Sequence, residues 1–124
     1  MDTVSPNIFV DDINSTIAYY KLLGFQQTVT VPETEPYVFA MMVRGTITFM
    51  FQTFQSIAED LPQVSRQNGG SLLLYIQIKD IRNFYEEIKD KVNVLKGLEK
   101  TFYGATEFSI LDINNYVLTF AEDE

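Results

Sequence analysis

Polar and apolar residues alternate near the C-terminal end of the chain, over residues 107–111, as they do in a half-buried β-strand. Asp112, Asn114 and Asn115 follow, and these residue types favour turns because they tolerate positive φ and bond their own backbone. Residues 116–121 are then rich in β-branched and aromatic side chains, which favour a strand. We therefore expect an antiparallel hairpin here, with the polar Thr119 in the middle of its second strand.

The rest of the chain repeats one order of strand, helix and three further strands. In the first half, the pattern predicts strands at residues 5–10, 25–31, 37–43 and 46–53. In the second half, it predicts strands at residues 72–79 and 92–98, before the hairpin. The polar stretch between the halves contains a short helical piece at residues 57–61 and no strand pattern. We expect one domain of residues 1–124, with modules at about 1–55 and 72–122 and a connector at about 56–71.

Each predicted helix carries one apolar stripe at helical spacing. The stripe residues are Ile17, Tyr20 and Leu22 or Leu23 in the first half, and Ile81, Phe84, Tyr85 and Ile88 in the second. Asn14 or Ser15 is expected to cap the first helix, and Gly24 to end it. Because a helix covers one face of each sheet, the polar strand residues belong on the other face. The sequence therefore predicts an α+β fold, in which two tandem βαβββ modules form a half-barrel with a cleft.

The composition excludes several classes of site. The chain has 124 residues without cysteine or histidine, which excludes disulfides, thiolate nucleophiles and thiolate or imidazole metal sites. Any metal ion would need oxygen ligands alone. The formal net charge of −8 disfavours nucleic-acid binding, because an acidic surface repels phosphate. The apolar runs are far shorter than the ~20 residues of a membrane span, and no signal-peptide pattern is present, so we expect a cytoplasmic protein without a membrane partner.

Two other features of the composition need an interpretation. We interpret the acidic run Glu122, Asp123 and Glu124 as a solvated tail. Seven tyrosines and ten phenylalanines are more than a small core needs. They form either an aromatic core or an aromatic-lined cavity for a planar or apolar ligand, and composition alone does not choose between these interpretations.

Three stretches carry motifs that occur together in a known family. Residues 9–25 combine FVDDI with AYY and LGF, residues 48–52 read TFMFQ, and residues 103–112 begin with YGATEF and end at Asp112. In this order and spacing they resemble the vicinal-oxygen-chelate superfamily, which includes glyoxalase I, bleomycin-resistance and fosfomycin-resistance proteins and extradiol dioxygenases. The resemblance spans nearly the whole chain and implies the glyoxalase/bleomycin resistance fold.

The resemblance also assigns the positions that hold a metal ion in the metal-dependent members of this family. Those members carry His or Glu at four inward strand positions, which fall here on Ser5, Thr48, Leu73 and Thr119. Neutral hydroxyls and an aliphatic side chain do not supply the charge that a divalent cation needs. The resemblance therefore implies a bleomycin-resistance-like member with no metal ligands and no cofactor.

The leading hypothesis is a protein that binds or sequesters a small, partly aromatic ligand in the cleft, with no catalytic residue assigned. The acidic net charge is compatible with a cationic ligand. Aromatic side chains would stack on the ligand, and polar ones would orient it. The inward residues expected to contact the ligand are Phe9, Thr48, Met50, Gln52, Tyr75, Tyr103 and Thr119. Ordinary packing or cross-strand hydrogen bonding explains each of these residues, taken singly, at least as well.

Two other hypotheses remain open. The first is a divergent glyoxalase-like or dioxygenase-like enzyme, a lyase or oxidoreductase with a non-standard or oxygen-only site. Metal-free catalysis with Glu107 as base and Tyr103 as acid belongs to this hypothesis. The second is a structural or interaction role. Because members of the family commonly dimerise, the resemblance implies a homodimer.

Overall fold

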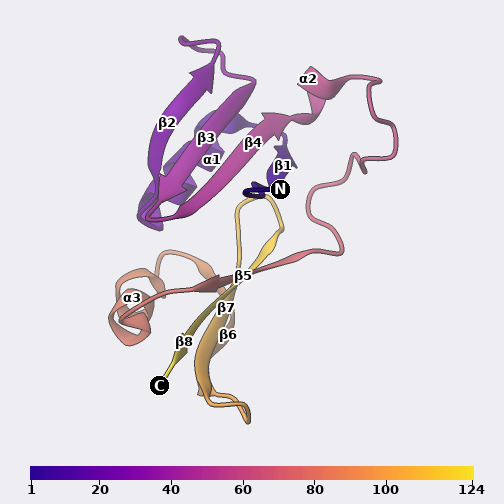
Figure 1. Cartoon of the computed structure of the whole chain (residues 1–124). Coiled ribbons are helices and arrows are strands. Elements are labelled where there is room, and N and C mark those ends of the chain that lie inside the picture. Colours follow the sequence, from indigo (N-terminus) through magenta and orange to yellow (C-terminus); the bar gives the residue numbers. More distant parts are fainter. The chain divides into compact units, whose positions relative to one another are not determined.

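Two separate four-stranded sheets form the framework of the protein, one in each of two units, Met1–Asn68 (unit 1) and Gly69–Glu124 (unit 2). The computed structural model describes all of residues 1–124 (Figure 1). The strand order is β1-β4-β3-β2 in the first sheet and β5-β8-β7-β6 in the second, so the two units repeat one topology. This repeat confirms the predicted α+β fold of two βαβββ modules.

The observed elements follow the predicted order. Unit 1 contains β1 (Asn7–Val10), α1 (Ile13–Leu22), β2 (Gln26–Val31), β3 (Phe39–Arg44), β4 (Ile47–Thr53) and α2 (Phe54–Ile57). Unit 2 contains β5 (Leu73–Gln77), α3 (Ile81–Ile88), β6 (Asn93–Lys100), β7 (Ala105–Leu111) and β8 (Val117–Asp123). None of the helices combines the length and the apolar character that crossing a bilayer requires.

The helix predicted at residues 57–61 is wrong in position. The observed α2 begins immediately after β4, because Thr53 Oγ1 accepts a hydrogen bond from the backbone N–H of Ser56 at 3.1 Å. It ends after one turn, since Ala58 has a φ of 49°, which an α-helix does not tolerate. Of the residues that we expected to be helical, Ile57 ends α2, and residues 58–61 form an irregular turn.

Tyr20 on α1 is the centre of the aromatic core of unit 1. It is fully buried, and its ring centroid lies 5.5 Å from that of Phe25, 5.9 Å from that of Phe49 and 4.8 Å from that of Phe51. Because successive strand residues point to opposite faces, Phe49 and Phe51 direct their rings to the α1 side of the sheet. The residues between and beside them on β4 belong to the face that α1 leaves uncovered.

The second sheet packs against α3 in the same way. The buried Phe84 lies 6.0 Å from Phe108 and 5.0 Å from Phe120, measured between ring centroids. Tyr85 packs edge-on against Phe108 at 4.9 Å. The apolar stripe predicted for this helix is therefore confirmed. As in unit 1, no helix covers the opposite face of the sheet.

The two long helices begin in different ways, and the cap predicted for the first is wrong. Asp12, rather than Asn14 or Ser15, caps α1, since its Oδ2 accepts from the backbone N–H of Ser15 at 2.8 Å. Asn14 instead donates from Nδ2 to Glu35 at 3.1 Å. Asp12 acts as the cap because its backbone is still extended, with a φ of −135°, where the chain leaves β1.

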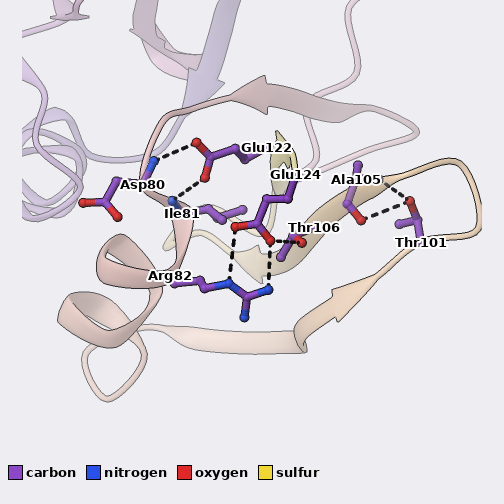
Figure 2. A network of polar contacts seen from close by, with 8 residues as sticks. All are labelled: Asp80, Ile81, Arg82, Thr101, Ala105, Thr106, Glu122 and Glu124. Carbon is purple, nitrogen blue, oxygen red and sulfur yellow. Dashed lines mark hydrogen bonds and ion pairs between the residues drawn. The ribbon is translucent and has the colours of Figure 1, made fainter.

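Helix α3 takes its N-terminal cap from a distant strand (Figure 2). Asp80 has a left-handed backbone with a φ of 60°, and its side chain makes no capping bond. The carboxylate of Glu122 on β8 accepts from the backbone N–H groups of Asp80 and Ile81, each at 3.0 Å. A carboxylate at this position also favours the positive end of the helix dipole.

Glu124, which follows β8, also contacts α3 and in addition β7 (Figure 2). Arg82 donates to its carboxylate from Nη2 at 2.8 Å and from Nε at 3.3 Å, and Thr106 donates from Oγ1 at 2.5 Å. The solvated tail that we expected at residues 122–124 is therefore wrong, because β8 continues to Asp123 and the glutamates on either side of it are anchored. Composition did not distinguish a free acidic run from a strand whose carboxylates have partners.

Candidate functional site

Four of the residues predicted to contact a ligand share the uncovered face of the unit 1 sheet. Phe9 on β1 is the register partner of Gln52 on β4, and Thr48 and Met50 alternate with the buried phenylalanines of β4. All four side chains are partly exposed. The structure thus brings these predicted residues of unit 1 together on one surface.

A groove of about 450 Å³ adjoins one end of this surface. Two of its lining residues, Phe9 and Gln52, were predicted to contact a ligand, whereas the others were not: Asn7, Ser56, Ile57, Asp60 and Leu61. The last four come from α2 and the turn after it. No periodic pattern marks that turn, so only the Pro and Gly content around it indicated an irregular segment.

Tyr75 and Tyr103 meet on the uncovered face of the unit 2 sheet. Tyr75 lies on β5, and Tyr103 lies in the turn between β6 and β7. Both phenol hydroxyls donate to the same oxygen, Oε2 of Glu107 on β7, at 2.5 Å. The two side chains remain about half exposed, at 49% and 56%. Two tyrosines and one carboxylate, the Glu107 cluster, therefore form a built polar site with open aromatic surface.

The Glu107 carboxylate stabilises the neutral form of both tyrosines. Its hydrogen bonds are the largest cause that raises the pKa of Tyr75 and of Tyr103 above the ordinary tyrosine value. A neutral phenol donates a hydrogen bond, whereas a phenolate would repel the carboxylate. The ammonium group of Lys96 pairs with Glu99 at 3.0 Å, and its pKa is raised first by Glu99 and also by attraction to Glu107. The Glu107 carboxylate thus carries a negative charge that forms no direct ion pair, with Lys96 as the nearby cation.

Phe102 extends the aromatic surface of the Glu107 cluster. It is fully exposed, and its ring lies edge-on to that of Tyr103 at a centroid distance of 5.0 Å. This residue was not among those predicted to contact a ligand. An exposed phenylalanine in a turn has no periodicity that could indicate its role.

Thr119 shares the uncovered face with Tyr75, its register partner, but it is only 5% exposed. Its Oγ1 lies 2.8 Å from the Oγ of Ser109 on the neighbouring strand. The observed contact of Thr119 is therefore a cross-strand hydrogen bond. Its predicted contact with a ligand remains a prediction.

The four positions that correspond to metal ligands in the metal-dependent relatives do not fit a divalent cation. Ser5 precedes β1, Thr48 lies on β4, Leu73 begins β5, and Thr119 lies on β8. Three of the side chains are neutral hydroxyls, and the fourth is aliphatic, so the set supplies no negative charge to a cation. Nowhere in the structure do three or more Asp, Glu, His or Cys side chains group in a way that could hold a metal ion.

Comparison with known proteins gives the same fold. A protein from Agrobacterium tumefaciens str. C58, of unknown function, superposes with a TM-score of 0.79 at 25% identity, covering 100% of this chain and 95% of that one. A bleomycin resistance determinant encoded on transposon Tn5 superposes with a TM-score of 0.73 at 20% identity, covering 100% and 99%. TioX from Micromonospora sp. ML1 superposes with a TM-score of 0.79 at 12% identity over the full length of both chains.

Sequence comparison extends from the fold to the family. No curated protein matches the chain significantly. The family description "Glyoxalase/Bleomycin resistance protein/Dioxygenase superfamily" matches residues 2–120, which is nearly the whole chain. The chain therefore belongs to the glyoxalase/bleomycin resistance protein/dioxygenase superfamily.

Proposed function

We propose that the protein binds a small, partly aromatic and cationic molecule, without a metal ion, at the Glu107 cluster of unit 2. One observation carries this proposal, namely that Tyr75 and Tyr103 converge on a single carboxylate oxygen while keeping half of their surface open. A cation is attracted both by the carboxylate and by the faces of the tyrosine rings. The aromatic part of the same ligand can stack on the exposed rings.

The charge of the whole protein supports a cation rather than an anion. A formal net charge of −8 raises the local concentration of cationic solutes and lowers that of anionic ones. Glu107 is also fixed in place by two hydrogen bonds, so a ligand that binds it need not order the carboxylate first. The superfamily to which the chain belongs includes bleomycin-resistance proteins, and this membership is compatible with a binding role.

The Glu107 cluster gives less support to acid–base catalysis. An enzyme in which Glu107 is the base and Tyr103 the acid requires Tyr103 to release a proton near neutral pH. The neighbouring carboxylate instead raises the pKa of Tyr103, which makes it a weaker acid than an ordinary tyrosine. We therefore favour binding, and we propose no reaction.

A matched pair of compounds tests the proposal. 2-Phenylethylamine is a cation at neutral pH, and 2-phenylethanol is its neutral counterpart, so the pair separates charge from aromatic stacking. In the presence of EDTA, the amine should raise the Tm of the protein much more than the alcohol does, because a ligand that binds only the folded state stabilises it.

Two variants locate the effect. Glu107→Gln should weaken amine binding roughly tenfold, because it removes the charge but keeps the shape. Glu87→Gln removes an exposed carboxylate of α3, the helix that packs on the opposite face of the same sheet, and it should leave amine binding unchanged. Equal shifts with both compounds, or no effect of Glu107→Gln, would contradict the proposal.

The homodimer expected from the family is also proposed here. Light scattering at increasing protein concentration should give twice the mass of the 14.3 kDa chain. A chain that stays monomeric at high concentration would refute the dimer without affecting the Glu107 cluster.

A further inference from the structure

A second groove, of about 290 Å³, runs along α1 on the outer side of unit 1. One wall is a stripe of α1, and the other is formed by β2 and the loop that follows it. The lining residues are Asn14, Ile17, Ala18 and Lys21 of α1, together with Gln27, Glu35 and Tyr37. None of them was predicted to contact a ligand. The groove shares no residue with the Glu107 cluster or with the groove beside β1 and β4, so it can be tested separately.

The two ends of this groove carry opposite charges. Asn14 and Lys21 lie seven residues apart on α1, which separates them by about 10 Å along the helix axis. At the first end, Asn14 Nδ2 donates to Oε1 of Glu35 at 3.1 Å, which holds the carboxylate beside the start of the helix. At the other end, Lys21 lies in the last turn. No ion pair of the structure includes Glu35 or Lys21, so both charges are open to a ligand.

Two neighbouring charges reinforce this pattern. Asp12 caps the start of α1, where its carboxylate accepts from the backbone N–H of Ser15. Arg44 lies at the other end, where its Nη1 donates to the carbonyl oxygen of Leu23 at 3.1 Å. The helix dipole opposes the pattern, but it places only about half an elementary charge at each end. The side chains therefore make the groove negative toward the start of α1 and positive toward its end.

The middle of the groove is apolar. Ile17, which is 6% exposed, and Ala18 lie between the two charged ends on the helix stripe, and the half-buried Tyr37 lines the groove as well. An aliphatic chain that covers these side chains removes apolar surface from water. Of the roughly 10 Å between Asn14 and Lys21, two polar contacts of about 2.8 Å each leave about 5 Å for the ligand. Its two charged groups must therefore be several carbons apart.

We propose that this groove binds a zwitterion of the ω-amino acid class, in which a short aliphatic chain joins an ammonium group to a carboxylate. The ammonium group pairs with Glu35 and donates to Asn14 Oδ1, which remains an acceptor after the Asn14 amide has donated to Glu35. The carboxylate pairs with Lys21. A free α-amino acid does not span the groove, because both of its charged groups are bonded to one carbon. This site goes beyond the proposed function, because it lies along the helix and recognises two opposite charges.

Four small probes separate the recognition elements. 5-Aminopentanoate carries both charges, pentylamine lacks the carboxylate, pentanoate lacks the ammonium group, and free glycine has both charges but no spacer. Each is titrated at low ionic strength into ¹⁵N-labelled protein and followed by backbone amide NMR signals. 5-Aminopentanoate should shift the signals of residues 14–21, Glu35 and Tyr37. It should bind about threefold or more tightly than each of the other three, a factor typical of an exposed ion pair.

Matched variants decide whether the groove is the site. Lys21→Gln should make 5-aminopentanoate bind no more tightly than pentylamine, and Glu35→Gln should make it bind no more tightly than pentanoate. Glu59→Gln, which removes an exposed carboxylate of unit 1 outside the groove, should keep both preferences. Glu107→Gln should leave the unit 1 signal changes intact, even if it abolishes binding in unit 2. Signal changes confined to unit 2, equal binding of all four probes, or preferences that survive Lys21→Gln and Glu35→Gln would overturn the proposal.

Discussion

Glu122 provides the sharpest test of how unit 2 is held together. Its carboxylate accepts hydrogen bonds from the backbone N–H groups of Asp80 and Ile81 at the start of α3, each at 3.0 Å. The substitution Glu122→Ala removes both bonds and leaves two N–H groups at the N-terminus of the helix without a protein partner. Water can reach this partly exposed site, so the full cost of an unpaired buried group does not apply.

The magnitude follows from the geometry. Loss of a helix cap typically costs about 0.5–2 kcal/mol, and the dipole adds a few tenths more, so we expect a loss of about 1.5 kcal/mol in the free energy of unfolding. For a chain of 124 residues, the entropy of unfolding is about 0.26 kcal/mol/K, which converts this loss into a fall in Tm of about 6 °C.

Calorimetry or urea unfolding monitored by circular dichroism measures the change. Asp123→Ala is the matched control, because it removes the neighbouring carboxylate from the same strand, where the side chain has no hydrogen bond or ion pair. Its Tm should change by about 1 °C or less. If Glu122→Ala were as stable as Asp123→Ala, the carboxylate would not be the cap of α3.

Three further predictions concern the core, the acidic anchor and the tyrosines. Phe51→Ala should destabilise unit 1 by about 3–5 kcal/mol in urea unfolding, because the ring is fully buried, whereas Phe102→Ala should change stability by about 0.5 kcal/mol or less. Arg82 lowers the pKa of Glu124, so the ion pair should contribute its full stability above the ordinary carboxyl pKa and lose it as the pH falls through the lowered pKa. The stability difference between wild type and Arg82→Gln should therefore shrink in acid, and a difference that stays constant with pH would refute the ion pair. Glu107→Gln should lower the pKa of the two tyrosines that donate to Glu107, so that tyrosinate absorbance appears at lower pH; an unchanged titration would contradict the observed hydrogen bonds.

Local pattern was sufficient for the fold because each strand and long helix buries one face. The apolar stripe of α1 with Tyr20 and the alternation along β4 each predicted a structure that packing then confirmed. The start of α3 was not predictable in this way, since its cap, Glu122, lies 41 residues beyond Ile81. The turn after α2 was also missed, because Arg66 specifies it through backbone carbonyl groups of any residue type.

For the candidate site, the sequence predicted only the sheet face on which its residues lie. Alternation placed Thr48, Met50 and Gln52 on the side of the sheet away from α1, as observed. It did not indicate that Tyr75 and Tyr103 share one carboxylate, since that contact depends on how the turn after β6 folds back. Carboxylate-to-hydroxyl contacts between separate elements have no sequence period, so they required the structure.

Isothermal titration of EDTA-treated wild-type protein with 2-phenylethylamine tests the central claim most directly. We predict saturable binding that weakens as salt is raised, because the attraction between the ammonium group and the acidic site is screened. We also predict that 2-phenylethanol binds at least about tenfold more weakly under the same conditions. Binding that appears only after a divalent metal ion is added, or binding that does not distinguish the amine from the alcohol, would contradict the account.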